Sequence, residues 1–131
     1  MFGQTPAPAP AEPQYHEEEC SFVVSLALAS GNAFADLKLN LDADYEFVLT
    51  HLIAKYDQAF SFNFNPPSGP PVFSTEVQAA NCFGTAQFPR PLLVPMVFSA
   101  GSQIKYAVTN LHAGDNNIEI VFGGYRRYRV N

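Results

Sequence analysis

The sequence has 131 residues and two cysteines, with seven basic and twelve acidic residues for a formal charge of −5. This length fits one domain. The composition, which is 47% hydrophobic and 15% charged, excludes a disordered chain. No apolar run reaches the roughly 18 residues of a membrane-spanning helix. The negative charge disfavours binding of nucleic acid or of an anionic membrane by the whole surface, so neither is expected as a partner.

Residues 1–19 are predicted to form an extended acidic arm, followed by a single domain at 20–131. Proline favours the polyproline II conformation, because it fixes its own φ and restricts the residue before it. Four prolines alternate with small residues in this segment, namely Pro6, Pro8, Pro10 and Pro13. The segment lacks the basic start and apolar stretch of a secretory signal, so the chain is expected to stay in the compartment where it is made. Cys20 and Cys82 are therefore expected as small buried apolar residues and not as a disulfide.

The first half of the domain alternates apolar and polar residues with the period of two that is typical of β-strands. Strands are predicted at 20–28, 34–41 and 44–56. The last of these also fits a helical spacing, but its β-branched and aromatic content favours a strand. The clearest alternation places Phe60, Phe62 and Phe64 on one face. If fully buried, each ring contributes about 1.5–3 kcal/mol, so this face is expected to be a principal part of the core.

The second half begins with a proline-rich connection at 66–71, which cannot join a central ladder because four of its six residues lack an amide hydrogen. A short strand at 72–78 and a long loop through 81–91 follow. Pro95 marks 92–98 as an edge strand, or as the bend where a strand changes sheet. The last predicted strands are 103–111 and 117–130, and Gly123 with Gly124 indicates a bulge or sharp bend in the final one.

Together these segments predict an all-β fold with seven or eight strands and no helix. Their spacing of about 8–12 residues is typical of a sandwich or closed barrel, and the chain is too short for βαβ crossovers, so the sheets are expected to be antiparallel. The prediction is an antiparallel β-sandwich of the jelly-roll type with an extended N-terminal arm; an immunoglobulin-like sandwich is the alternative.

The sequence predicts no catalytic residue, no metal site and no cofactor. Its three histidines, His16, His51 and His112, lack the closely spaced Cys or His pairs of a zinc site, and there is neither a nucleophile elbow nor a phosphate-binding glycine loop. A carbohydrate-binding module with tyrosines as stacking platforms stays open. A hydrolase or isomerase on a cupin-like barrel is a further alternative, and it would need a metal.

Charge is divided between the two ends of the chain. Residues 1–20 carry four acidic residues and no basic one, whereas residues 125–131 carry three arginines. One interpretation is that both ends are simply solvated. The other is that the acidic arm docks on the arginine strand of another subunit, with aromatic rings buried beside the ion pairs. The candidate interface residues are Phe2, Tyr15, Glu17, Glu18, Glu19, Tyr125, Arg126, Arg127 and Arg129.

The C-terminal third resembles small virion proteins of tailed bacteriophages. The matching residues are 88–111, FPRPLLVPMVFSAGSQIKYAVTNL, and 118–128, IEIVFGGYRRY. Similar proteins are jelly-roll decoration or cement proteins, which sit on the capsid as dimers or trimers and stabilise the shell. Such proteins lay extended arms across neighbouring capsid subunits, and the arm at 1–19 is compatible with this.

The resemblance implies a non-enzymatic structural protein of the virion, assembled in the host cytoplasm. Its expected partners are the major capsid protein or other virion subunits and further copies of itself. A receptor- or glycan-binding module of a tail fibre or baseplate is the alternative.

Overall fold

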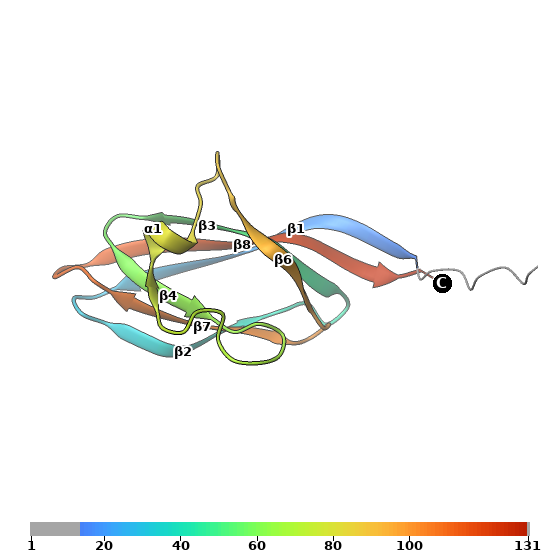
Figure 1. Ribbon diagram of the computed structural model, residues 1–131, viewed down its shortest axis with the longest axis horizontal. Helices are drawn as coiled ribbons and strands as arrows, with labels where there is room; N and C mark the ends of the chain where they lie inside the picture. Colours follow the sequence, from blue (N-terminus) through green and yellow to red (C-terminus); the bar gives the residue numbers. More distant parts are fainter. Residues whose placement is uncertain (1–13, 131) are drawn as a thin grey trace, which may run out of the picture.

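The computed structural model describes residues 14–130, which form two antiparallel four-stranded sheets packed face to face. The first sheet has the order β1-β8-β3-β6 and the second the order β2-β7-β4-β5. The predicted antiparallel β-sandwich is therefore confirmed (Figure 1). The strands are β1 (Tyr15–Leu28), β2 (Ala33–Asn40), β3 (Glu46–Tyr56), β4 (Phe60–Phe64), β5 (Val77–Gln78), β6 (Arg90–Phe98), β7 (Gln103–Asn110) and β8 (Asn116–Arg129).

Strand β1 begins at Tyr15, five residues before the predicted start at Cys20. Residues 15–19 therefore belong to strand β1 of the first sheet and not to the predicted arm. These residues form a strand because β8 is as long as β1 and provides a pairing residue for each of them, from Arg129 opposite Tyr15 to Tyr125 opposite Glu19. Residues 1–13 of the predicted arm, which include Phe2, lie outside the described residues.

The segment between β4 and β6 also differs from the prediction. Of the strand expected at 72–78 only Val77–Gln78 pairs with a neighbour, and one helical turn, α1 (Ala79–Cys82), follows where no helix was expected. The residues before β5 instead lie against β4, where the side chain of Asn63 donates to the Phe73 carbonyl and accepts from its amide. Within residues 14–130, no helix is long and apolar enough to cross a bilayer.

The core lies between the two sheets and is dominated by aromatic rings. Phe60, Phe62 and Phe64 are all at most 1% exposed, as their alternation predicts. Phe62 is central, because its ring contacts those of Phe64, Phe83, Tyr106 and Phe122 at centroid distances of 4.6–6.2 Å. Both cysteines are free thiols, as expected; Cys82 is fully buried in this core, whereas Cys20 is only half-buried.

The two glycines of β8 accompany an irregularity in the neighbouring strand. Thr50 is an extra residue in β3, where Leu49 pairs with Gly124 and His51 with Gly123, while the β1 ladder on the other side of β8 continues without a break. A Cβ atom on Gly124 would overlap the Val48 carbonyl oxygen. The irregularity is thus at the expected position, but the extra residue lies in β3; Gly124 lets the β3 backbone approach, and Gly123 leaves room for the His51 ring.

Candidate protein interface on the β1–β8 ribbon

Strands β1 and β8 run side by side past the end of the sandwich (Figure 1). We call their last six residue pairs, Tyr15–Cys20 with Gly124–Arg129, the ribbon. Strand β3 pairs with β8 only as far as Arg127, so Tyr128 and Arg129 have strand neighbours in β1 alone among the described residues. Eight of the nine predicted interface residues lie on this ribbon, although the sequence placed them at opposite ends of the chain.

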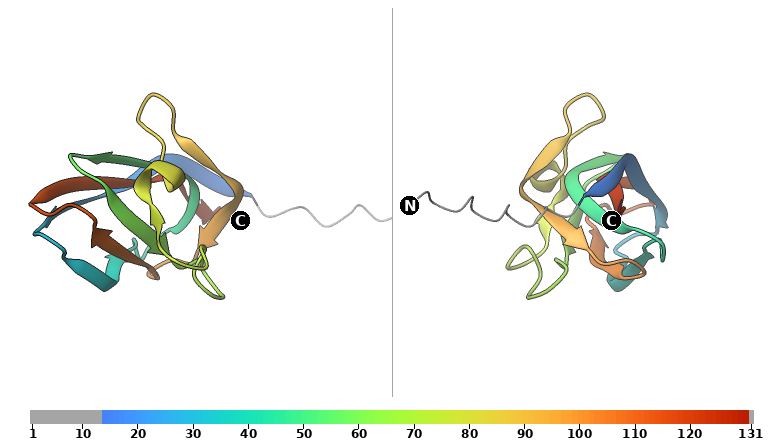
Figure 2. Two further views of the ribbon diagram at one scale, coloured as in Figure 1. Left: turned by 60° about the vertical axis from the view of Figure 1, so that its left-hand side comes forward. Right: turned by 90° about the vertical axis from the view of Figure 1, so that its right-hand side faces the viewer.

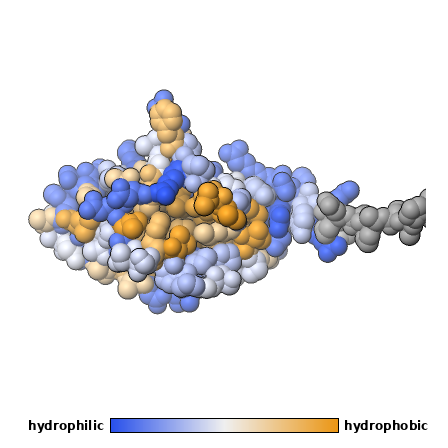
Figure 3. Space-filling model, in the orientation of Figure 1, coloured by the Kyte–Doolittle hydropathy of each residue, from blue (hydrophilic) through white to orange (hydrophobic). Residues whose placement is uncertain are grey.

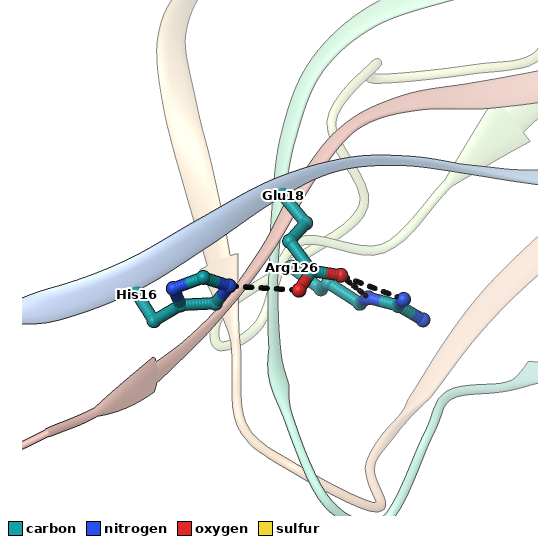
Figure 4. A network of polar contacts seen from close by, with 3 residues as sticks. All are labelled: His16, Glu18 and Arg126. Atoms are coloured by element: carbon teal, nitrogen blue, oxygen red, sulfur yellow. Dashed lines mark hydrogen bonds and ion pairs between the residues drawn. The ribbon is translucent and has the colours of Figure 1, made fainter.

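One face of the ribbon carries a network centred on Glu18. Glu18 is directly opposite Arg126, and opposite residues of an antiparallel pair project to the same side. The Arg126 guanidinium donates to Glu18 Oε2 from Nε at 3.1 Å and from Nη2 at 2.8 Å. The other carboxylate oxygen, Oε1, lies 2.7 Å from His16 Nε2. Figure 4 shows Glu18 between its two partners.

Aromatic rings surround this network. The Arg126 guanidinium carbon lies 4.9 Å from the centre of the Tyr45 ring, within cation–π distance. Tyr128 is in ring contact with both Tyr45 and His16, at 5.4 and 5.1 Å. Tyr128 is opposite His16 in the ladder, and Tyr45 stands immediately before β3. The face therefore combines three ring systems with a charged pair at the surface.

The ion pair stabilises the charged forms of both partners. The hydrogen bonds from Arg126, and then the contact with His16, lower the pKa of Glu18 below its ordinary value of 4.5. The hydrogen bond to Glu18 in turn raises the pKa of Arg126. Because both side chains are reached by solvent, dissolved salt screens the pair, and its effect is on local geometry more than on global stability.

The opposite face of the ribbon carries a second arginine. The Arg127 guanidinium lies 4.3 Å from the centre of the Tyr15 ring, and its Nε donates to Glu46 Oε1 at 3.3 Å. Within residues 14–130, Glu17, Glu19 and Arg129 make no ion pair. On this face Arg127 is therefore paired within the chain, whereas the exposed charges of Glu17, Glu19 and Arg129 are available to another protein.

These contacts change the interpretation of the charge split. Two of the three arginines form ion pairs within the chain, but only Arg126 pairs with the acidic segment, through Glu18; Arg127 pairs with Glu46 of β3. Docking across subunits stays a prediction for Glu17, Glu19 and Arg129. Tyr45 and Glu46 were missed because they lie about eighty residues from their arginines, and only the register of β3 on β8 brings them together.

A second candidate surface lies on the edge strand β6. Leu93 is fully exposed, Val94 is 68% exposed and Val97 39% exposed, and Phe88 in the preceding loop is 74% exposed. That loop stands out from the body in all three ribbon views (Figures 1 and 2). Apolar surface gathers between β6 and the segment that follows β4 (Figure 3). The edge position agrees with the prediction from Pro95, but the exposure of its neighbours was not foreseen.

Among residues 14–130, no three His, Cys, Asp or Glu side chains lie together in a way that would hold a metal ion. Comparisons of the chain with protein-family models, with curated proteins and with solved structures find no match.

Proposed function

We propose that this chain is a structural subunit of a bacteriophage particle, a decoration or cement protein that joins neighbouring subunits of the head. The observation that carries the proposal is the apolar surface along β6. Soluble monomers rarely leave large aliphatic side chains grouped in the open, because removing each from water contributes about 1.5–3 kcal/mol. Grouped exposure of this kind is typical of a surface that another protein covers.

The pairing of the strands supports a jelly-roll assignment. The first strand pairs with the last, the second with the seventh, the third with the sixth and the fourth with the fifth. This is the pattern of one long hairpin rolled into two sheets. Eight-stranded jelly rolls are frequent in viral capsid domains and in lectins. The segments that resemble virion proteins, 88–111 and 118–128, contain most of β6, β7 and β8.

The ribbon supports the second half of the proposal, a charged contact with capsid subunits. Glu17, Glu19 and Arg129 are exposed and unpaired within the described residues, next to aromatic rings. Mixed charges of this kind select a partner and its orientation more than they add affinity. The major capsid protein is the proposed partner.

The test is whether the chain travels with particles. An affinity-tagged full-length chain is expressed in the infected host, and particles are separated on a density gradient. The chain is expected in the particle band at a stoichiometric level, and particles that lack it are expected to lose their genome at a lower temperature. Recovery of the chain only at the top of the gradient, with particles of unchanged heat resistance, would refute the proposal.

A second candidate is the glycan- or receptor-binding module of a tail fibre or baseplate. It is favoured by the exposed Tyr128 ring, which lies beside Tyr45, His16 and the Glu18–Arg126 pair. Tyrosine faces next to paired charged groups suit stacking on a sugar ring. On a glycan array this candidate predicts binding that Tyr128→Ala abolishes. The control is Tyr125→Ala, because Tyr125 is half-buried on the opposite face of the ribbon.

A further inference from the structure

An apolar groove runs between β6 and the segment that follows β4. Its volume is about 310 Å³. Most of its lining side chains are apolar. One side of the groove consists of β4 and the segment after it, and the other side consists of β6. The first side contributes Phe64, Val72 and Phe73, and the second Leu92, Leu93 and Met96. Arg90 is the one charged residue among the described lining residues. The groove coincides with the apolar surface in Figure 3.

The shape of β6 explains why this groove stays open. Met96 pairs with Leu49 of β3 and Pro91 pairs with His51, so the four residues between them on β6 stand opposite Thr50 alone. Pro91 and Pro95 cannot donate ladder hydrogen bonds. The strand therefore bows away from β3, and Leu93 and Val94 are left exposed.

The same prolines restrict what can bind. An added β-strand needs amide donors along the free edge, and Pro95 interrupts them. A ligand in the polyproline II conformation has no such requirement, because it is recognised through apolar contacts in a groove lined with rings. Phe73 supplies a partly exposed ring here, and the buried Phe64 ring packs edge-on against it at 6.4 Å.

We propose that residues 1–13 of one copy of this chain bind in this groove on a second copy. The segment MFGQTPAPAPAEP is made largely of proline, alanine and other apolar residues, with Phe2 as the one large ring and Glu12 as the one charged side chain. Phe2 fits the apolar part of the groove, and Glu12 complements Arg90. The proposal rests on the assembly function above and names the surface and the segment that join the subunits.

The position of β1 favours a second copy over the same chain. Tyr15 lies at the outer end of the ribbon, and followed towards the N-terminus β1 runs away from the sandwich (Figure 1). The alternation of proline with alanine at 6–11 favours extended polyproline II backbone, which carries a chain in one direction. At about 3.1 Å per residue, thirteen residues in the polyproline II conformation span about 40 Å, which is enough to reach a neighbouring subunit.

The first experiment measures self-association of the full-length chain by sedimentation velocity over a range of concentrations. Three variants are compared with the unchanged chain: Phe2→Asp in the segment, Leu93→Asp with Val94→Asp in the groove, and Val23→Asp as the control. Val23 is an exposed valine on β1, far from the groove residues in sequence and in sheet order. The first two variants are expected to weaken association at least tenfold, and the control to leave it unchanged.

The second experiment titrates a fluorescent peptide of residues 1–13 into the Phe2→Asp chain, whose groove is free. Saturable binding is expected, at least tenfold weaker to the Leu93→Asp/Val94→Asp chain. A mixture of the Phe2→Asp chain with the Leu93→Asp/Val94→Asp chain is expected to regain association. The Phe2→Asp chain supplies an intact groove, and the Leu93→Asp/Val94→Asp chain supplies an intact segment of residues 1–13.

Three results would overturn the inference. If Phe2→Asp has no effect while the groove variant abolishes association, two β6 surfaces pack on each other and the segment is not the occupant. If the unchanged chain stays monomeric at every concentration and binds no peptide although the Phe2→Asp chain does, the segment occupies its own groove. If the chain is found in particles yet both variants associate normally, this inference fails and the proposed function stands; absence from particles is the separate result that refutes the function.

Discussion

The Phe62→Ala substitution tests the architecture most directly, because Phe62 is 0% exposed and touches rings from both sheets. A buried phenylalanine removes about 150–250 Å² from water, which at about 25 cal/mol per Å² corresponds to about 4–6 kcal/mol. Alanine retains part of this, so we expect a loss of about 3–5 kcal/mol. Since a domain of this size has about 5–15 kcal/mol of stability, that loss is a large share of it.

The assay is urea unfolding of the full chain, followed by tyrosine fluorescence and by circular dichroism. Each kcal/mol lowers the melting temperature by about 4 °C at this chain length, so a decrease of about 12–20 °C is expected as well. The matched control is Phe88→Ala, which removes the same atoms from a ring that is 74% exposed and is expected to change stability by less than about 0.5 kcal/mol. A loss below about 1 kcal/mol for Phe62→Ala, or an equal loss for both variants, would refute the assignment of Phe62 to the centre of the core.

Three further predictions concern other parts of the molecule. Because Arg126 lowers the pKa of Glu18, their contact stabilises the folded chain above the ordinary pKa of 4.5, and this stabilisation is lost as the pH falls through the lower pKa of the folded state. The Arg126 Nε–H resonance should therefore shift only below pH 4.5, and Glu18→Gln should abolish that titration. Gly124→Ala is expected to destabilise the chain by several kcal/mol, about 3 or more, since the new methyl group would overlap a β3 carbonyl; near-normal urea unfolding would show that β3 moves aside freely. Burial raises the pKa of Cys82 to about 12, so a thiol reagent at pH 8 should modify Cys20 first, and equal rates would contradict the burial of Cys82.

The parts of the fold that follow from local alternation were predictable. The register of Phe60, Phe62 and Phe64 needs only the period of two and the burial of the larger face, so strand β4 and its contribution to the core are confirmed. Pro95 places β6 at an edge for a similarly local reason, the missing amide donor.

The parts that depend on distant partners were not predictable. Residues 15–19 look like a solvated acidic tail until β8 is placed beside them, and then each charge has a position in a ladder. Asn116 likewise resembles an ordinary turn residue, and Asn110 a polar residue near the end of a strand, but both are buried and bond to carbonyl groups of distant loops, at Ala29 and Gln58. No property of the local sequence encodes these contacts, because they arise from the order of strands in the sheets.

The pairing of the first strand with the last has a consequence for synthesis. Among the described residues β1 has only β8 as a strand neighbour, and the two are separated by almost the whole chain. A ribosome adds about 5–20 residues per second, so β1 stays unpaired for several seconds before β8 leaves the ribosome. During this time the half-apolar face of β1 is accessible to chaperones. A product that ends before β8 therefore lacks the ribbon. Such incomplete copies are excluded from any assembly that recognises the ribbon.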